Sequence, residues 1–129
     1  MPAGDPFTPD QRRQIDKARA QAAGDAGLGF HVYLGPLTDD PRTGAQRLHA
    51  RLPDAASAVL VAVDPRAHAL EIVTGAQARL VLDDGSCGLA ALTMQTAFAA
   101  GDLAGGIVRG LNQLGDHARQ PDTLHTEQV

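Results

Sequence analysis

The segment SAVLVAV, residues 57–63, constrains the fold more than any other part of the sequence. Its residues are apolar at odd and even positions alike, whereas a strand with one face in water alternates apolar and polar residues. Such a strand must be covered on both faces, which requires packed layers on either side of a sheet. The segment therefore predicts the central strand of an α/β domain.

Helical patterns precede this strand. A capping signature, TPDQ at residues 8–11, begins a first helix whose apolar stripe is Ile15, Ala18 and Ala22. Residues 30–34 then alternate as a strand does, and a second helix follows Asp40 and ends before Pro53. Because that second helix lies between the two strands, we expect the strands to be parallel.

Turn chemistry follows the apolar strand. The sequence DPRAH, residues 64–68, is typical of a turn, and ALEIVTG after it resumes strand character. These two segments predict an antiparallel hairpin with the central strand. Residues 78–82, ARLVL, are predicted as a short further strand.

Two helices close the sequence. Cys87, Ala91, Met94 and Phe98 share one stripe, as do Leu103, Ile107, Leu111, Leu114 and Ala118. Between them Gly101 suits a left-handed helix end, and Asp102 suits the cap of the next helix. We expect a three-layer α/β/α sandwich with a small mixed sheet, formed by one domain over residues 9–119 between flexible segments at 1–8 and 120–129.

Composition excludes several classes of function. The chain has 129 residues, a formal charge of -4 and 3% aromatic residues, so neither a basic footprint nor a base-stacking platform for nucleic acid is indicated. Cys87 is the single cysteine, which excludes an internal disulfide. The first residues lack the apolar core of a signal peptide, and no apolar run is long enough to span a bilayer. We expect a cytoplasmic protein and leave peripheral membrane association open.

Strong catalytic signatures are missing from the sequence. It contains no phosphate loop, no GxGxxG and no HExxH, so no catalytic residue and no nucleotide cofactor is assigned. What remains is a set of carboxylates at the ends of predicted elements: Asp54, Asp83, Asp84 and Asp102. Hard cations such as Ca²⁺ need several such oxygens, which makes these residues candidate metal ligands. The alternative is that they cap helices and form turns.

The order of elements resembles that of the TPM-type domain, a family named partly for a thylakoid-lumen photosystem-repair protein. The resemblance covers residues 10–118 and rests on three segments: RRQIDKARAQAAGDAGLGFHVYL, VLVAVDPRAHALEIVTG and GDLAGGIVRG. Within that family the sequence is most similar to a compact, uncharacterised branch from high-GC bacteria.

The resemblance implies an α/β/α sandwich but no single activity. Some plant members are described as acid phosphatases, calcium is associated with the acidic cleft of the family, and other members are assembly factors of membrane complexes. It places Asp83 and Asp102 at acidic motif positions, and Asp54 near the loop before the apolar strand. The sequence departs from the family pattern at Leu103, which replaces an aromatic residue, and at residues 55–57, which replace an Asn-Gly pair.

Three hypotheses of function follow. The leading one is a binding or accessory module for a protein partner, with Gly105, Gly106 and Arg109 beside an exposed groove as interaction residues, because glycine is unfavourable inside a helix unless something approaches closely. The alternative is a metal-assisted phosphatase that uses Asp83, Asp84 and Asp102. A third is a structural domain that self-associates through a sheet edge.

Overall fold

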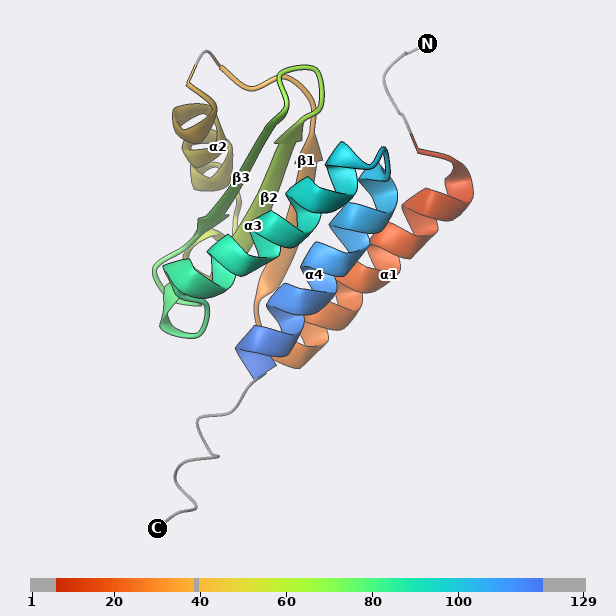
Figure 1. Cartoon of the computed structure of the whole chain (residues 1–129). Coiled ribbons are helices and arrows are strands. Elements are labelled where there is room, and N and C mark those ends of the chain that lie inside the picture. Colours follow the sequence, from red (N-terminus) through yellow and green to blue (C-terminus); the bar gives the residue numbers. More distant parts are fainter. Residues whose placement is uncertain (1–6, 39, 120–129) are drawn as a thin grey trace.

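The computed structural model describes residues 7–38 and 40–119 as a small α/β fold. In this part of the chain, four α-helices and three strands follow one another as α1 (Pro9–Ala26), β1 (Gly29–Leu34), α2 (Pro41–Ala50), β2 (Ala58–Asp64), β3 (Ala69–Thr74), α3 (Asp84–Ala99) and α4 (Leu103–Arg119) (Figure 1). Short 3-10 turns, η1 (Ala55–Ser57) and η2 (Ala78–Leu80), precede β2 and α3.

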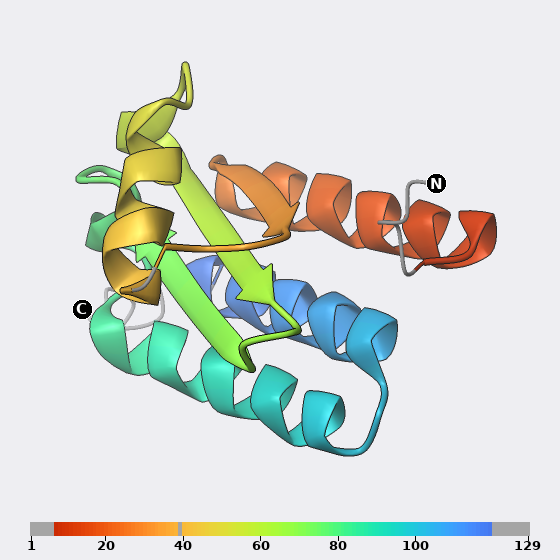
Figure 2. The ribbon, with the colours of Figure 1, turned by 90° about the horizontal axis from the view of Figure 1, so that it is seen from above.

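The sheet has the order β1-β2-β3, with β1 and β2 parallel and β2 and β3 antiparallel, which confirms both predicted pairings. Every residue of β2 is buried. Val59, Val61 and Val63 face a core formed with α1, α3 and α4, whereas Leu60 and Ala62 face a smaller core with α2. Helices therefore cover both faces of the sheet, as the apolar strand predicts (Figure 2).

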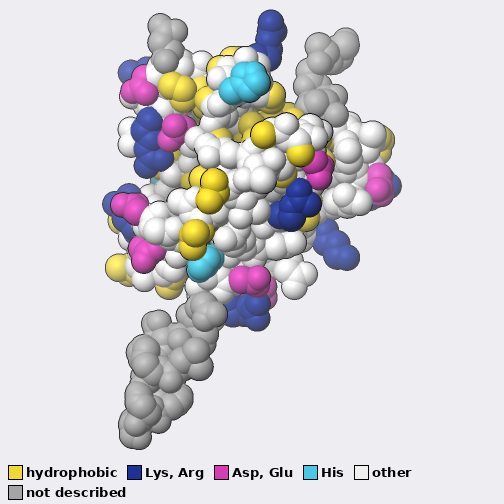
Figure 3. Space-filling model, in the orientation of Figure 1, with side chains coloured by type: hydrophobic (Ala, Val, Ile, Leu, Met, Phe, Trp, Pro, Cys, Tyr) yellow, Lys and Arg dark blue, Asp and Glu magenta, His cyan; other side chains and the backbone are white. Residues whose placement is uncertain are grey.

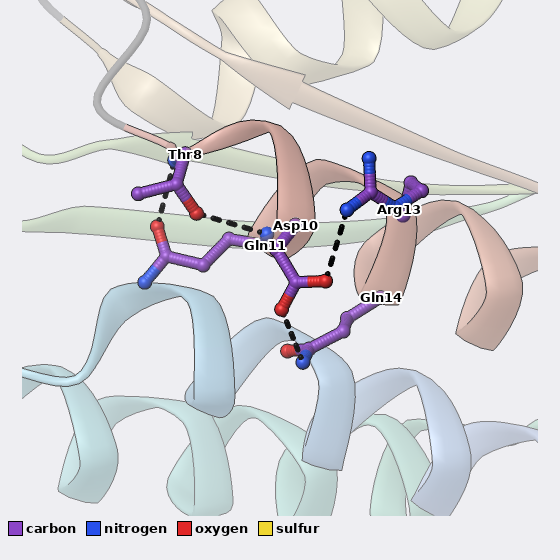
Figure 4. Close-up of polar contacts among 5 residues, drawn as sticks. All are labelled: Thr8, Asp10, Gln11, Arg13 and Gln14. Atoms are coloured by element: carbon purple, nitrogen blue, oxygen red, sulfur yellow. Dashed lines mark hydrogen bonds and ion pairs between the residues drawn. The ribbon is translucent and has the colours of Figure 1, made fainter.

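The first helix begins as its sequence predicts. The Thr8 hydroxyl accepts from the backbone N–H of Gln11 at 3.1 Å, and the Gln11 side chain accepts from the Thr8 N–H at 2.9 Å (Figure 4). In the same turn the carboxylate of Asp10 accepts from Arg13 and Gln14. This capping box satisfies two backbone donors that a helix start otherwise leaves unpaired.

The segment predicted to be flexible, residues 1–8, includes two residues that the structure describes. Phe7 packs against the larger core and Thr8 caps α1, although both residues fall in the segment predicted to be flexible. The rest of that segment, residues 1–6, and the predicted tail at residues 120–129 lie outside the described residues, so the domain limits stay a prediction.

The prediction of a strand at residues 78–82 is wrong. Ala78–Leu80 form the 3-10 turn η2, in which the Ala78 side chain and the neighbouring Leu82 are fully buried. Leu80 is 84% exposed and Val81 is 43% exposed, so the apolar run does not line one buried surface. The pattern was ambiguous because short apolar runs occur in strands and in tight turns alike.

Arginine side chains cover backbone carbonyls at both edges of the sheet. Arg19 donates to the carbonyl of Phe30 on β1 at 3.2 Å. On β3, Arg42 donates to the carbonyl of Ile72 at 2.8 Å and Arg79 to that of Thr74 at 2.9 Å. Charged side chains on an edge strand oppose pairing with another strand. These contacts speak against the hypothesis of self-association through a sheet edge.

Gly75 is required by the close approach of two backbone segments. A Cβ there would collide with the carbonyl oxygens of Ala55 and Ala56. We predict that Gly75→Ala lowers the free energy of unfolding by about 1–3 kcal/mol, because backbone must move to make room. Denaturant unfolding of the purified protein measures the change.

The matched control for that substitution is Gly24→Ala in α1, where a Cβ meets nothing within 4 Å. Alanine there should raise the free energy of unfolding by up to about 1 kcal/mol, because it is the better helix former. Equal effects of the two substitutions would contradict the packing argument.

Candidate functional site

A groove lies at the edge of the sheet where β2 ends. The turn between β2 and β3 forms one wall, and the corner between α3 and α4 forms the other. It encloses about 470 Å³ and is lined by Val63, Asp64, Pro65, His68, Ala69, Leu70, Gln95, Phe98, Ala99, Gly101 and Leu103. Its walls are mainly apolar, and its volume is within the range of ligand-binding clefts. Ligands of α/β proteins gather at the carboxyl ends of parallel strands, which is where this groove lies.

Asp64 fixes the two loops beside the groove. Its side chain is buried and accepts from the backbone N–H of Leu37 at 3.1 Å and from that of Ala67 at 3.3 Å. The first bond holds the loop after β1, and the second holds the hairpin turn. Asp64 is therefore engaged in positioning the groove wall.

His68 closes the hairpin turn in an uncommon backbone conformation. Its φ is 55°, in the left-handed region that few non-glycine residues adopt. Its N–H donates to the carbonyl of Pro65 at 3.3 Å. The turn consequently places His68 and Pro65 together on the rim of the groove.

Asp102 lies at the joint between α3 and α4, as the sequence predicts. Gly101 has a φ of 86°, and the Asp102 carboxylate accepts from the Gly105 N–H at 2.9 Å as a helix cap does. Its other oxygen pairs with Arg109 at 3.3 Å. Both candidate residues, Asp102 and Arg109, are exposed and engaged with one another.

Asp83 and Asp84 lie at the opposite end of α3 from Asp102. The Asp83 carboxylate caps α3 by accepting from the Ser86 N–H at 2.8 Å, and this bond lowers the pKa of Asp83. The 16 residues of α3 span roughly 24 Å at the usual rise of 1.5 Å per residue. No single ion can contact both Asp83 and Asp102, so the geometry does not provide the shared metal site that the phosphatase hypothesis requires.

Asp54 directly precedes η1, lies beside the start of β1 and contacts none of the other candidate ligands. Its carboxylate is 3.1 Å from Nε2 of His31, and this hydrogen bond is the main cause that lowers the pKa of Asp54. Within residues 7–38 and 40–119, no group of three or more His, Cys, Asp or Glu side chains is placed to hold a metal ion. The four predicted ligands are thus divided among three places.

Internal packing accounts for the glycines of α4. A Cβ at Gly105 would collide with the carboxylate of Asp102, and one at Gly106 would lie 2.9 Å from the Cβ of Ala97 on α3. Gly110 meets Met94 of α3 in the same way. The close approach that the glycines predict is therefore made by α4 to α3 within the chain. A role of Gly105 and Gly106 in binding a partner stays a prediction, and the close packing of these glycines no longer supports it.

The outer face of α3 carries apolar side chains into solvent. Among the described residues, the exposed large hydrophobic side chains are Leu80 (84%), Val81 (43%), Leu89 (52%) and Leu92 (60%), all on α3 or directly before it. Figure 3, in the orientation of Figure 1, shows yellow side chains among white atoms over this helix. This face was not predicted from the sequence. The signal was present, because residues 85–101 contain no charged residue and a surface helix normally has a charged side.

Comparison with known proteins assigns a family. Residues 1–115 match the family described as "Domain of unknown function (DUF5130)". The chain belongs to this family. It is 29% identical over 100 residues to "Uncharacterized protein Rv2468c" and to "Uncharacterized protein MT2543", both from Mycobacterium tuberculosis strains. The match covers 78% of this chain and 60% of each relative, which is less than two thirds of their length. This relationship fits the expected origin in high-GC bacteria.

Two solved structures share the fold. One is the BA42 protein from the psychrophilic bacterium Bizionia argentinensis, with a TM-score of 0.79 and 17% identity over 90% of this chain and 83% of that one. The other is the N-terminal domain of the cg2496 protein from Corynebacterium glutamicum, with a TM-score of 0.73 and 17% identity over 88% of this chain and 74% of that one. Both likenesses concern the fold alone.

No helix within the described residues has both the length and the apolar character needed to cross a membrane. A cytoplasmic location stays a prediction.

The cap at Asp102 gives a first test of the site residues. We predict that Asp102→Ala lowers the free energy of unfolding by about 1 kcal/mol, whereas Asp102→Asn, which still accepts from the Gly105 N–H, changes it little. Thermal unfolding with and without millimolar Ca²⁺ measures both the stability of each variant and its binding of Ca²⁺. A rise of the midpoint with Ca²⁺ that Asp102→Ala abolishes would instead show that Asp102 is a metal ligand.

The bond between His31 and Asp54 gives a second test. Since this bond lowers the pKa of Asp54, its contribution to stability is present above the carboxyl's pKa in the unfolded chain and is lost as the pH falls through the lower folded-state pKa. We predict that His31→Ala raises the pKa of Asp54, as measured by NMR titration of its carboxyl carbon. An unchanged titration midpoint would contradict this assignment.

Proposed function

We propose that the chain is a binding module for a protein partner, and that the partner docks at the groove between the β2–β3 turn and the corner of α3 and α4. The observation that carries the proposal is that the mainly apolar groove adjoins the uncharged outer face of α3, which carries exposed leucines. Ala99 lines the groove and the exposed Leu92 lies two turns earlier on the same stripe, with the uncharged polar side chains of Gln95 and Thr96 between them.

The groove and the helix face have the composition of an interaction site. The groove supplies apolar walls from Leu70, Phe98 and Leu103, with the polar side chains of His68 and Gln95 among its lining residues. Apolar centres with a few polar groups are typical of protein interfaces. Exposed apolar surface that is contiguous marks interaction sites more often than scattered apolar residues do.

The phosphatase alternative gains no support from the arrangement of the carboxylates. It requires Asp83 and Asp102 on one ion, and the length of α3 separates them. The calcium cleft that the TPM-like resemblance implies stays a prediction, which the thermal unfolding with and without Ca²⁺ tests.

Photo-crosslinking at the groove tests the proposal. With p-benzoylphenylalanine in place of the exposed Ala99, irradiation in an extract of the organism that makes the protein should give a discrete adduct. The purified partner should then bind the unmodified chain, and Ala99→Trp should weaken that binding about tenfold or more, because the indole fills the groove.

The matched control places the same crosslinker at the exposed Gln46 of α2, on the other side of the sheet. It should give no such adduct. Equal adducts from both positions, or none from Ala99, would contradict a protein-binding groove.

A further inference from the structure

The outer face of α3 combines an uncharged surface with one acidic end. Residues 85–101 contain no charged side chain, and Leu89 and Leu92 are 52% and 60% exposed in the middle of this run. At the amino-terminal end of the helix, the carboxylates of Asp83 and Asp84 are both exposed. Leu80 and Val81 extend the apolar surface at the same end.

The carboxylates at the two ends of α3 differ in their partners. At the far end Asp102 already pairs with Arg109 at 3.3 Å. At the near end Asp83 accepts from Ser86 of its own helix start, and the neighbouring Arg79 donates to the carbonyl of Thr74. The amino-terminal end of α3 thus presents carboxylates to an approaching molecule, whereas the other end presents a neutral pair.

The geometry points to an amphipathic helix of the protein partner as the occupant of this face, running antiparallel to α3 and carrying Lys or Arg in its last turn. This inference rests on the proposed function and names its partner. Basic residues in a last turn are favoured by the helix macrodipole. In the antiparallel arrangement they lie against Asp83 and Asp84, while the apolar stripe of the partner covers Leu89 and Leu92.

A second copy of this chain fits the face less well. In a two-fold pair of α3 helices, the acidic end of one copy meets the carboxyl end of the other helix, where residues 97–101 supply no basic side chain. Arg109 is nearby but pairs with Asp102. An anionic lipid surface fits less well too, because it attracts basic segments and this rim is acidic.

Helical peptides of the length of α3 provide the probe. One peptide has a Leu stripe, Gln elsewhere and Lys in its last turn, and its counterpart has Glu in place of each Lys. The Lys peptide should bind the full chain and shift the amide NMR signals of α3. The Glu peptide should bind about fivefold more weakly, as expected for the loss of two exposed ion pairs.

Variants of the full chain separate the two parts of the inference. Leu92→Glu should weaken the binding of the Lys peptide about tenfold or more. Gln46→Glu, which adds the same charge on α2, should leave the binding of that peptide unchanged. Replacing both acids, Asp83→Asn and Asp84→Asn, should make the two peptides bind equally well. Asparagine still caps the helix at residue 83, so the fold is retained.

Four results would overturn the inference. They are no binding of either peptide, equal binding of both peptides by the unmodified chain, a dimer in sedimentation equilibrium that Leu92→Glu dissociates, and binding to phosphatidylglycerol vesicles that Leu92→Glu abolishes. The proposed function fails separately, through the absence of an adduct at Ala99. A groove adduct without peptide binding would therefore keep the binding module and reject this partner.

Discussion

The burial of β2 on both faces is the constraint on which the rest of the fold depends. Its alternate side chains face two different cores, so helices are needed on both sides of a sheet that has only three strands in the described part of the chain. With one strand on each side of β2, β1 and β3 are the edge strands of this sheet, and arginine side chains cover carbonyls on both of them. The groove lies where β2 ends, so the same strand that organises the cores also positions the candidate site.

The larger core explains why α3 has an apolar outer face. The buried side of α3 packs Ala90, Met94 and Ala97 against α4, and Gly106 and Gly110 let the two helices approach closely. The opposite side of α3 has no such neighbour within the described residues, yet it carries the exposed Leu89 and Leu92 and no charged side chain from residue 85 to residue 101. A helix that is apolar all round is normally covered, and this mismatch is the physical basis of the proposed function.

Local sequence signals predicted the fold well wherever one interaction decides the structure. The capping box at Thr8 and the joint at Asp102 depend on neighbours in the sequence, and the strand at residues 58–64 is marked by its own unbroken apolar run. The prediction of a strand at residues 78–82 was wrong because a run of apolar residues this short shows no period that distinguishes a strand from a tight turn.

The candidate site was predicted less well because it depends on contacts between distant residues. The acids at Asp54, Asp83 and Asp102 share a chemistry, but only the path of the chain shows that they lie apart. The groove joins residues 63–70 with residues 95–103, and nothing in either segment alone marks it. The outer face of α3 is visible in the sequence as a run without charged residues, but the apolar period of that helix predicts only its buried stripe.

The most direct test of the account is hydroxyl-radical footprinting of Leu80, Leu89 and Leu92. The purified chain would be compared with the same chain in a native extract of the organism that makes it, with Tyr33, which packs in the smaller core, as the internal reference. The account predicts that oxidation of the three leucines falls in the extract relative to Tyr33, because a partner covers α3. Unchanged oxidation of all three would show that the face stays open to water and would contradict the central claim.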